Sequence, residues 1–247
     1  MIPVAMTAAP RTEAVQERCI VSVLRAGFRD LTVFAEPGTN SQAVQSAEWV
    51  IWNPQCLGEY HNWLSALEWL LCERPAAPLL ATCQDDIVLC HDVAAYCDGL
   101  EWPTERCGCV HLYTSKRYGG CYPLGRMSRL QTVHARCMSA ACFLVFTRSA
   151  AEYLVSYSHR VGWRGHTTLR IETPHLMEGL DTFIGEALTA GGYEIWIHNP
   201  SMGQHIAKDS VLGHGGPYGA RVAANWPGEA ASAWDLFGGC SATRSDL

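Results

Sequence analysis

Two adjacent carboxylates interrupt an otherwise apolar stretch, T-C-Q-D-D-I-V-L-C at residues 82–90. Asp85 and Asp86 stand between the apolar residues 79–81, which are typical of a buried strand, and the apolar residues 87–89. Like charges side by side repel, and burying either one without a partner is costly or shifts its pKa. A cation or a hydrogen-bonded ligand at this point removes the conflict, and so does a turn that exposes both side chains to water.

The composition indicates a folded globular chain. Of its 247 residues 48% are hydrophobic and 17% are charged, which suits one large domain or two small ones and argues against disorder. The apolar runs are too short to span a membrane, so no membrane partner is expected. A net charge of −6 argues against broad binding to nucleic acid. A local basic strip comprises Lys116, Arg117, Arg126, Arg129 and Arg136, and its simplest interpretation is a solvated loop.

The chain contains twelve cysteines. Residues 1–6 show neither a basic start nor a long apolar core, so no signal peptide is predicted and we expect a cytoplasmic protein with reduced thiols. Cys107 and Cys109, with Cys97 and Cys121, are the best candidates for a zinc site. Neither a C-x2-C pair nor paired histidines follow at zinc-finger spacing, so small buried thiols are the favoured interpretation.

Apolar periodicity predicts alternating strands and helices in the first part of the chain. The strands cover residues 2–7, 31–35, 49–52 and 79–83, and the helices lie around residues 15–27 and 63–71. This alternation is typical of a parallel α/β sheet, which binds ligands at the carboxyl ends of its strands.

The rest of the chain is less regular. Strands are predicted at residues 110–113, 142–146 and 194–198, and helices at residues 148–160 and 178–190. Residues 115–136 and 200–230 are too long and too rich in Gly, Pro and polar residues to be simple connections, so we expect functional or mobile segments there. We therefore place a boundary near residue 105, which divides one sheet into residues 1–105 and residues 106–247.

Several segments follow one another in a recognisable order. They are a strand ending MTAAPR, a helix reaching AGF, a strand ending VFAEPG, then GEYHNW, QDDI, GLDTFIGEAL and HNPSMGQHIAKDS. In this order they resemble GT-A fold glycosyltransferases over residues 2–213, most specifically through QDD combined with NPS..QHI. The resemblance implies an α/β, GT-A (Rossmann-like) mixed sheet flanked by helices, with irregular acceptor-side loops. It also implies an enzyme that uses a nucleotide-sugar donor, a UDP-sugar being the first expectation. Residues 1–105 are then the nucleotide-sugar-binding half, and residues 106–247 are the acceptor-binding and catalytic half of the same domain.

The resemblance implies a divalent metal, Mn2+ or Mg2+, held by Asp86 and His205. A cation that bridges two phosphates stabilises the charge that builds up as a nucleoside diphosphate leaves. Hard cations prefer carboxylate oxygen, and Mn2+ also accepts imidazole. Without a metal, Asp86 is an ordinary acid at a strand-to-turn junction and His205 a satisfied polar residue.

Three neighbouring roles are assigned by position. In the family's D-x-D motif the first acid contacts the ribose, whereas this chain has Gln84, which can still hydrogen-bond a hydroxyl but departs from the pattern. Asp85 then faces the sugar or solvent. Lys208 pairs with the diphosphate or is a solvated loop cation.

The remaining donor-binding candidates follow the first strands. Thr7 and Ala9 permit close approach of the backbone, Arg11 faces the phosphates, and Glu36 accepts hydrogen bonds from the base or ribose. Without a role in binding, Arg11 is a charged surface residue at the start of a helix and Glu36 is an acid in a turn. Asn62 contacts the nucleotide or sugar, or caps the helix that follows it.

Inverting transfer needs a base that deprotonates the acceptor hydroxyl. Asp181 is the first candidate, because it opens a helix whose apolar residues pack inward, and Glu178 is the reserve. The alternative for both is the ordinary preference for acids in the first turn of a helix.

Three other interpretations stay open. The sequence also resembles phage-encoded transferases, whose acceptor is a hydroxymethylated pyrimidine in DNA. The base would be flipped into a pocket while the basic strip contacts the phosphates, and the enzyme would act in an infected host cell. A nucleotidyltransferase shares the metal and the nucleotide site but usually has a Gly-rich basic loop after the first strand. A non-catalytic nucleotide-binding protein would retain the fold alone.

Overall fold

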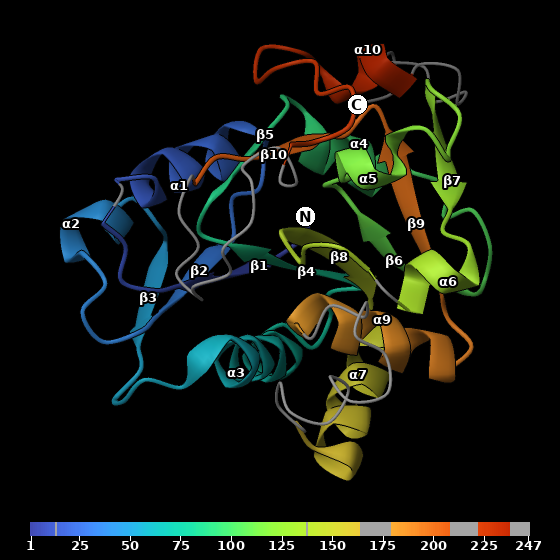
Figure 1. The fold of residues 1–247 in the computed structure, drawn as a ribbon. Helices are drawn as coiled ribbons and strands as arrows, with labels where there is room; N and C mark the ends of the chain where they lie inside the picture. Colours follow the sequence, from blue (N-terminus) through green and yellow to red (C-terminus); the bar gives the residue numbers. More distant parts are fainter. Residues whose placement is uncertain (13, 137, 164–178, 208–221, 238–247) are drawn as a thin grey trace.

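A mixed eight-stranded sheet forms the centre of the computed structural model, which describes residues 1–12, 14–136, 138–163, 179–207 and 222–237 (Figure 1). The strand order is β3-β2-β1-β4-β8-β6-β9-β7. The strands are β1 (Val4–Ala8), β2 (Leu31–Ala35), β3 (Trp49–Trp52), β4 (Leu79–Gln84), β6 (Cys107–His111), β7 (Arg126–Arg129), β8 (Phe143–Thr147) and β9 (Glu194–Asn199). A separate antiparallel pair comprises β5 (Ile87–Leu89) and β10 (Gly203–His205). The predicted α/β mixed sheet flanked by helices is confirmed.

Helices cover both faces of this sheet (Figure 1). On one face lie α3 (Gly58–Glu73), α7 (Arg148–Val161) and α9 (Leu180–Ala190), with the short α6 (Thr132–Arg136) beside α9. On the other lie α1 (Gln16–Arg25), α4 (Val93–Gly99), α10 (Ala233–Phe237) and the β5–β10 pair, with α2 (Ser41–Val44) and α5 (Lys116–Gly119) at its margins. No helix among the described residues is long and apolar enough to cross a membrane.

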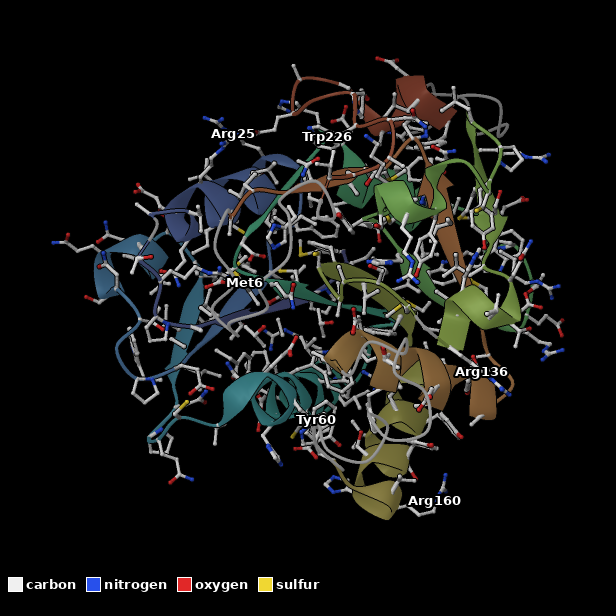
Figure 2. All side chains as sticks on the ribbon, viewed as in Figure 1. Met6, Arg25, Tyr60, Arg136, Arg160 and Trp226 are labelled. Atoms are coloured by element: carbon white, nitrogen blue, oxygen red, sulfur yellow. The ribbon has the colours of Figure 1, made fainter. Side chains whose placement is uncertain are left out.

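Two apolar cores result from this layering. Along β1, Val4 and Met6 belong to the core under α1, whereas Ala5 belongs to the core under α3. Because both faces are covered, β1 is apolar at successive positions and does not alternate with polar residues. Figure 2 shows the contrast between Met6 inside the molecule and Arg160 at its periphery.

The strands β3, β2, β1 and β4 are mutually parallel, and β8 runs antiparallel to β4. The carboxyl ends of β1 and β4 therefore meet the start of β8 at one edge. The expectation of an irregular segment at residues 115–136 is wrong in part, because α5, β7 and α6 lie there and β7 pairs with β9.

Candidate functional site at the carboxyl end of β4

The register of the parallel strands brings residues distant in the sequence to Asp85 and Asp86. Thr7 of β1 lies opposite Gln84 of β4, so the chain that leaves β1 passes beside both aspartates. The backbone N–H of Ala9 donates to Oδ2 of Asp85 at 3.2 Å. This hydrogen bond joins the loop after β1 to the end of β4, at the edge of the sheet where ligand binding is expected.

Asp85 has a hydrogen-bond donor on every side. Arg11 donates to its Oδ1 through Nε at 2.8 Å and Nη2 at 2.5 Å, and Gln16 donates to its Oδ2 at 2.7 Å. Asp85 is 2% exposed. Its carboxylate thus joins β4, the loop after β1 and the start of α1, so that it faces neither an open sugar site nor solvent.

Asp86 has unused hydrogen-bonding capacity. Its Oδ2 accepts from Nη2 of Arg11 at 2.7 Å and lies 3.0 Å from Nε2 of His205, whereas its Oδ1 has no partner among the described residues. His205 reaches this position because β10 pairs with β5 in a register that sets it opposite Ile87, and Ile206 N–H donates to the Asp86 carbonyl. The structure therefore brings together Asp86 and His205, and their role as metal ligands stays a prediction.

The protonation of the two aspartates differs in direction. Burial raises the pKa of Asp85 above its ordinary value, although Arg11 and Gln16 stabilise the anion. Burial acts in the same direction on Asp86, but His205 and Arg11 together outweigh it and lower the pKa of that carboxyl. Asp86 is therefore the carboxylate of the pair that stays ionised most readily.

The Asp86–His205 pair fits a divalent cation. Neighbouring ligands of an octahedral ion at about 2.1 Å lie about 3.0 Å apart, and Oδ2 of Asp86 is 3.0 Å from Nε2 of His205. Among the described residues no group of three or more His, Cys, Asp or Glu side chains is arranged to hold a metal. Two protein ligands suffice where substrate phosphates and water complete the shell, as is usual for Mg2+.

Glu59 is a site residue that the sequence analysis did not identify. It lies in the first turn of α3, and Nε2 of Gln84 donates to its Oε1 at 3.3 Å. Burial, together with the negative charges of Asp181 and Asp86, raises the pKa of Glu59 to about 7. An acid in the first turn of a helix is common for reasons of the helix dipole, so its type and position gave no functional signal.

The raised pKa of Glu59 predicts that the stability of the protein depends on pH. Because its pKa rises from 4.5 to about 7 on folding, the native state retains a proton that the unfolded chain has lost between these values. Stability should fall as pH rises through this window, by at most about 3 kcal/mol. We expect Glu59→Gln to match the wild type near pH 4 and to exceed its free energy of unfolding by up to about 3 kcal/mol near pH 8.

Urea unfolding at several pH values checks this prediction. The exposed Glu105, replaced by glutamine, is the matched control and should change little at any pH. A difference between Glu59→Gln and wild type that does not change with pH would contradict the raised pKa.

Asp181 lies at the same edge of the sheet. Its Oδ2 accepts from Ala140 N–H at 2.6 Å and its Oδ1 from Thr182 N–H at 2.8 Å, which joins α9 to the loop before β8. Gln84 N–H donates to the Cys142 carbonyl at 2.9 Å, so this loop adjoins the end of β4. The other predicted base, Glu178, and the predicted donor-binding Lys208 lie outside the described residues.

Glu36 and Asn62 are held within the fold. The Glu36 carboxylate accepts from the N–H groups of Leu57 and Gly58 at 2.9–3.1 Å, at the start of α3. Asn62 donates to the Phe34 carbonyl at 3.2 Å. The interpretation of Asn62 as a helix cap is wrong, because α3 already begins at Gly58.

Replacing Glu36 by alanine is expected to lower the free energy of unfolding by about 2 kcal/mol. The substitution leaves two amides at the start of α3 without their acceptor, and Glu36 itself is 3% exposed. Chemical denaturation measures the change, and Glu105→Ala is the control, expected within about 0.5 kcal/mol of wild type. Wild-type stability for Glu36→Ala would show that the carboxylate is not holding α3.

An open hollow adjoins Arg11. Its volume is about 360 Å³, within the range of small-molecule sites. It is lined by Arg11, Thr12, Ala14, Gln16, Glu17, Asn40, Gln42, Ala43 and Gln45. The predicted donor-binding Thr7 lies at the end of β1, and its hydroxyl faces the Cys83 carbonyl at 3.5 Å. This hollow has several amide side chains in its lining, which could hydrogen-bond a polar ligand.

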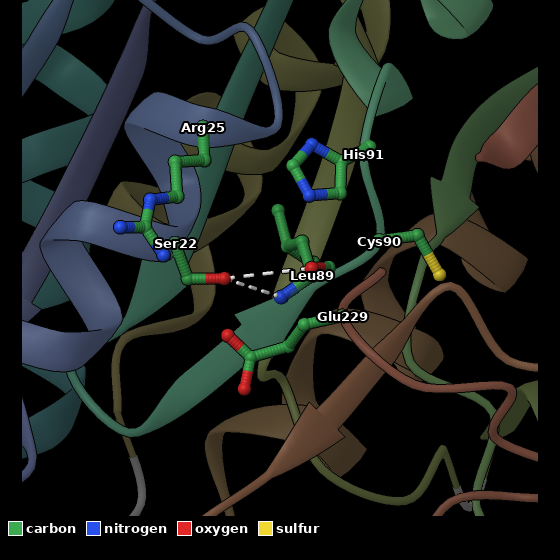
Figure 3. A pocket seen from close by; sticks show the side chains of 6 residues that line it. All are labelled: Ser22, Arg25, Leu89, Cys90, His91 and Glu229. Atoms are coloured by element: carbon green, nitrogen blue, oxygen red, sulfur yellow. Dashed lines mark hydrogen bonds between the residues drawn. The ribbon is translucent and has the colours of Figure 1, made fainter. Parts of the chain in front are cut away.

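A second cavity, between α1 and β5, is too small for such a ligand (Figure 3). Its volume is about 20 Å³, which accommodates roughly one water molecule. The Ser22 hydroxyl accepts from Leu89 N–H at 2.8 Å along its wall. The cavity is therefore a packing feature of the layer around α1.

The fold and the site define an α/β protein with a polar, carboxylate-rich edge at the ends of parallel strands. No protein-family model matches the chain, and no curated protein matches it. A mannosyltransferase from Pyrobaculum calidifontis, solved with GDP-Man and Mn2+, is similar in structure with a TM-score of 0.43 and 16% identity, over 66% of this chain and 47% of that one. A putative glucose-1-phosphate thymidylyltransferase from Bacillus anthracis, solved with a sucrose, has a TM-score of 0.39 and 8% identity, over 65% of this chain and 78% of that one. The chain thus spans about half of the mannosyltransferase, and these similarities do not identify a reaction.

Proposed function

We propose that this protein is a metal-dependent glycosyltransferase that moves a sugar from a nucleoside diphosphate sugar to an acceptor hydroxyl, with inversion. The observation that carries the proposal is the Asp86–His205 pair. Its facing atoms are 3.0 Å apart, and the other carboxylate oxygen of Asp86 is buried and has no hydrogen-bond partner among the described residues. Such an oxygen is costly unless a ligand uses it. Glu59 and Asp181 add negative charge at the same edge, which a cation would offset.

The donor is proposed to lie across the ends of β1 and β4. The nucleoside occupies the hollow between α1 and α2, and the diphosphate lies beside Arg11, next to Asp86 and His205. Mn2+ or Mg2+, held by Asp86 and His205, supplies electrostatic stabilisation of the departing diphosphate. In this proposal Gln84, whose amide donates to Glu59, binds a hydroxyl of the ribose or sugar.

Asp181 is proposed to accept the proton of the acceptor hydroxyl. The N–H groups of Ala140 and Thr182 fix the orientation of its carboxylate. Fixed orientation is what a general base needs, because proton transfer depends on the distance and alignment of the two groups. Glu59 is near enough to Asp181 for their charges to interact, so the two acids share the acceptor side of the site.

Thermal stability against a panel of nucleotides and nucleotide sugars, each with and without Mn2+, tests the proposal. UDP and UDP-sugars come first, followed by the GDP and TDP series. A ligand at a hundred times its Kd stabilises the native state by about 2.7 kcal/mol, which shifts the melting temperature visibly. A shift that needs both nucleotide and metal supports the donor site.

The absence of any shift across the panel would overturn the donor site. Once a donor is known, saccharides, proteins and hydroxymethylated DNA are screened as acceptors. Turnover then separates an enzyme from a non-catalytic binding protein, and the product separates glycosyl transfer from nucleotidyl transfer.

A further inference from the structure

The Arg11 guanidinium bridges both aspartates at the position where a cation would be needed. Its Nη2 lies 2.5 Å from Oδ1 of Asp85 and 2.7 Å from Oδ2 of Asp86. The Arg11 side chain is 10% exposed, and those of Asp85 and Asp86 are 3% and 6% exposed. One positive and two negative side chains thus lie almost out of contact with water, where each depends on its partners.

The two ends of this bridge are unequal. On Asp85, Arg11 is held through both Nε and Nη2, and the other oxygen of Asp85 is fixed by Ala9 and Gln16. On Asp86, Arg11 makes a single hydrogen bond to the oxygen that also faces His205. Arg11 can therefore release Asp86 and remain bound to Asp85.

We propose that Arg11 is a built-in counter-ion that neutralises Asp86 in the metal-free protein and yields it to the divalent cation when the nucleotide diphosphate binds. The proposal rests on the metal site of the proposed function. A cation on Asp86 and His205 would lie beside the Arg11 guanidinium, whose Nη2 is 2.7 Å from the Oδ2 that faces His205, and two cations side by side repel. A diphosphate gives the released guanidinium a new partner, because its planar fork matches phosphate oxygens.

This exchange predicts that metal and nucleotide bind cooperatively. Metal alone must displace Arg11 without compensation, so it binds weakly, whereas metal with a diphosphate binds tightly. The coupling is reciprocal, so the metal must strengthen nucleotide binding by the same factor. Asp85 acts in this scheme as the residue that positions Arg11.

The experiment measures binding of Mn2+ alone to the full chain by calorimetry and by thermal stability. In Arg11→Met we expect Mn2+ to bind at least about tenfold more tightly than in wild type, because its competitor is gone. Mn2+ should also restore the melting temperature that this variant loses in the absence of metal. Arg11→Lys, which keeps one charge but lacks the fork, should have intermediate affinity and serves if Arg11→Met does not fold.

Arg74→Met is the matched control. Arg74 donates two hydrogen bonds to the carboxylate of Asp30, at 2.7 and 2.9 Å. Its removal should leave Mn2+ affinity at the wild-type value. Comparison of the two variants shows whether the change in Mn2+ affinity comes from removing the Arg11 charge beside Asp86 or from losing any ion pair.

The outcomes distinguish the inference from the proposed function. If Arg11→Met binds Mn2+ no more tightly than wild type, while Mn2+ still enhances nucleotide binding in wild type, the exchange is overturned and the metal site stands. If neither protein binds Mn2+ with or without nucleotide, both the exchange and the metal site are overturned. Tighter Mn2+ binding together with reduced metal–nucleotide cooperativity in Arg11→Met supports the exchange.

Discussion

Replacing Asp86 by asparagine is expected to lower the rate of sugar transfer about a thousandfold or more while the protein remains folded. A neutral amide is a poor ligand for a hard cation, so the departing diphosphate loses the charge stabilisation proposed for this site. A thousandfold loss corresponds to about 4 kcal/mol of transition-state stabilisation. The fold should persist because Arg11 stays bound to Asp85, which accepts two further hydrogen bonds from Ala9 and Gln16.

Two measurements on Asp86→Asn check this result. The first is release of nucleoside diphosphate from the donor identified by thermal stability, and the second is the Mn2+-dependent shift with that nucleotide, which should disappear. Asp98→Asn is the control, since Asp98 is an exposed acid at the end of α4 that forms an ion pair with the amino terminus of the chain. A variant at Asp86 that retains the metal-dependent shift would show that the metal lies elsewhere.

The strands near this site could be predicted because their signal is local. The predicted strands at residues 31–35 and 49–52 coincide with β2 and β3, since an apolar run between turn residues suffices to define a strand. Short elements that depend on pairing could not be predicted. The strand β7 has the sequence R-M-S-R and is formed by its antiparallel contact with β9, which leaves no apolar run to find.

Several residues of the candidate site could be identified from the sequence, but their hydrogen bonds and ion pairs could not. Asp86 and His205 were expected together, and the register between β5 and β10 brings them to 3.0 Å. Arg11 was expected on phosphate, yet in the structure it lies on the two aspartates, because the partner of a cation is set by the tertiary placement of nearby anions. Glu59 was missed for the same reason, since its raised pKa arises from burial and from acids distant in the sequence.

Asp181→Asn is expected to reduce turnover by about 10²- to 10⁴-fold, the usual contribution of a general base. Binding of nucleotide and Mn2+ should be unchanged, because the proposed donor site is formed by the loop after β1, by α1 and α2, by the residues after β4 and by β10. The substitution also weakens a structural contact: an amide nitrogen cannot accept from Ala140 or Thr182, so the free energy of unfolding should fall by about 1 kcal/mol. Turnover must therefore be expressed per folded molecule.

The pH dependence of the rate separates a base from a structural acid. In wild type the rate should rise with pH until the base is ionised, and Asp181→Asn should lose this rise, whereas mere destabilisation would lower the rate at every pH alike. Glu186→Gln is the control, because Glu186 is a partly buried acid on the same helix and lacks a proposed role. If Asp181→Asn keeps its turnover and Glu59→Gln loses it, the proton acceptor is on α3. The acceptor would then approach the donor from the start of α3 and not from α9.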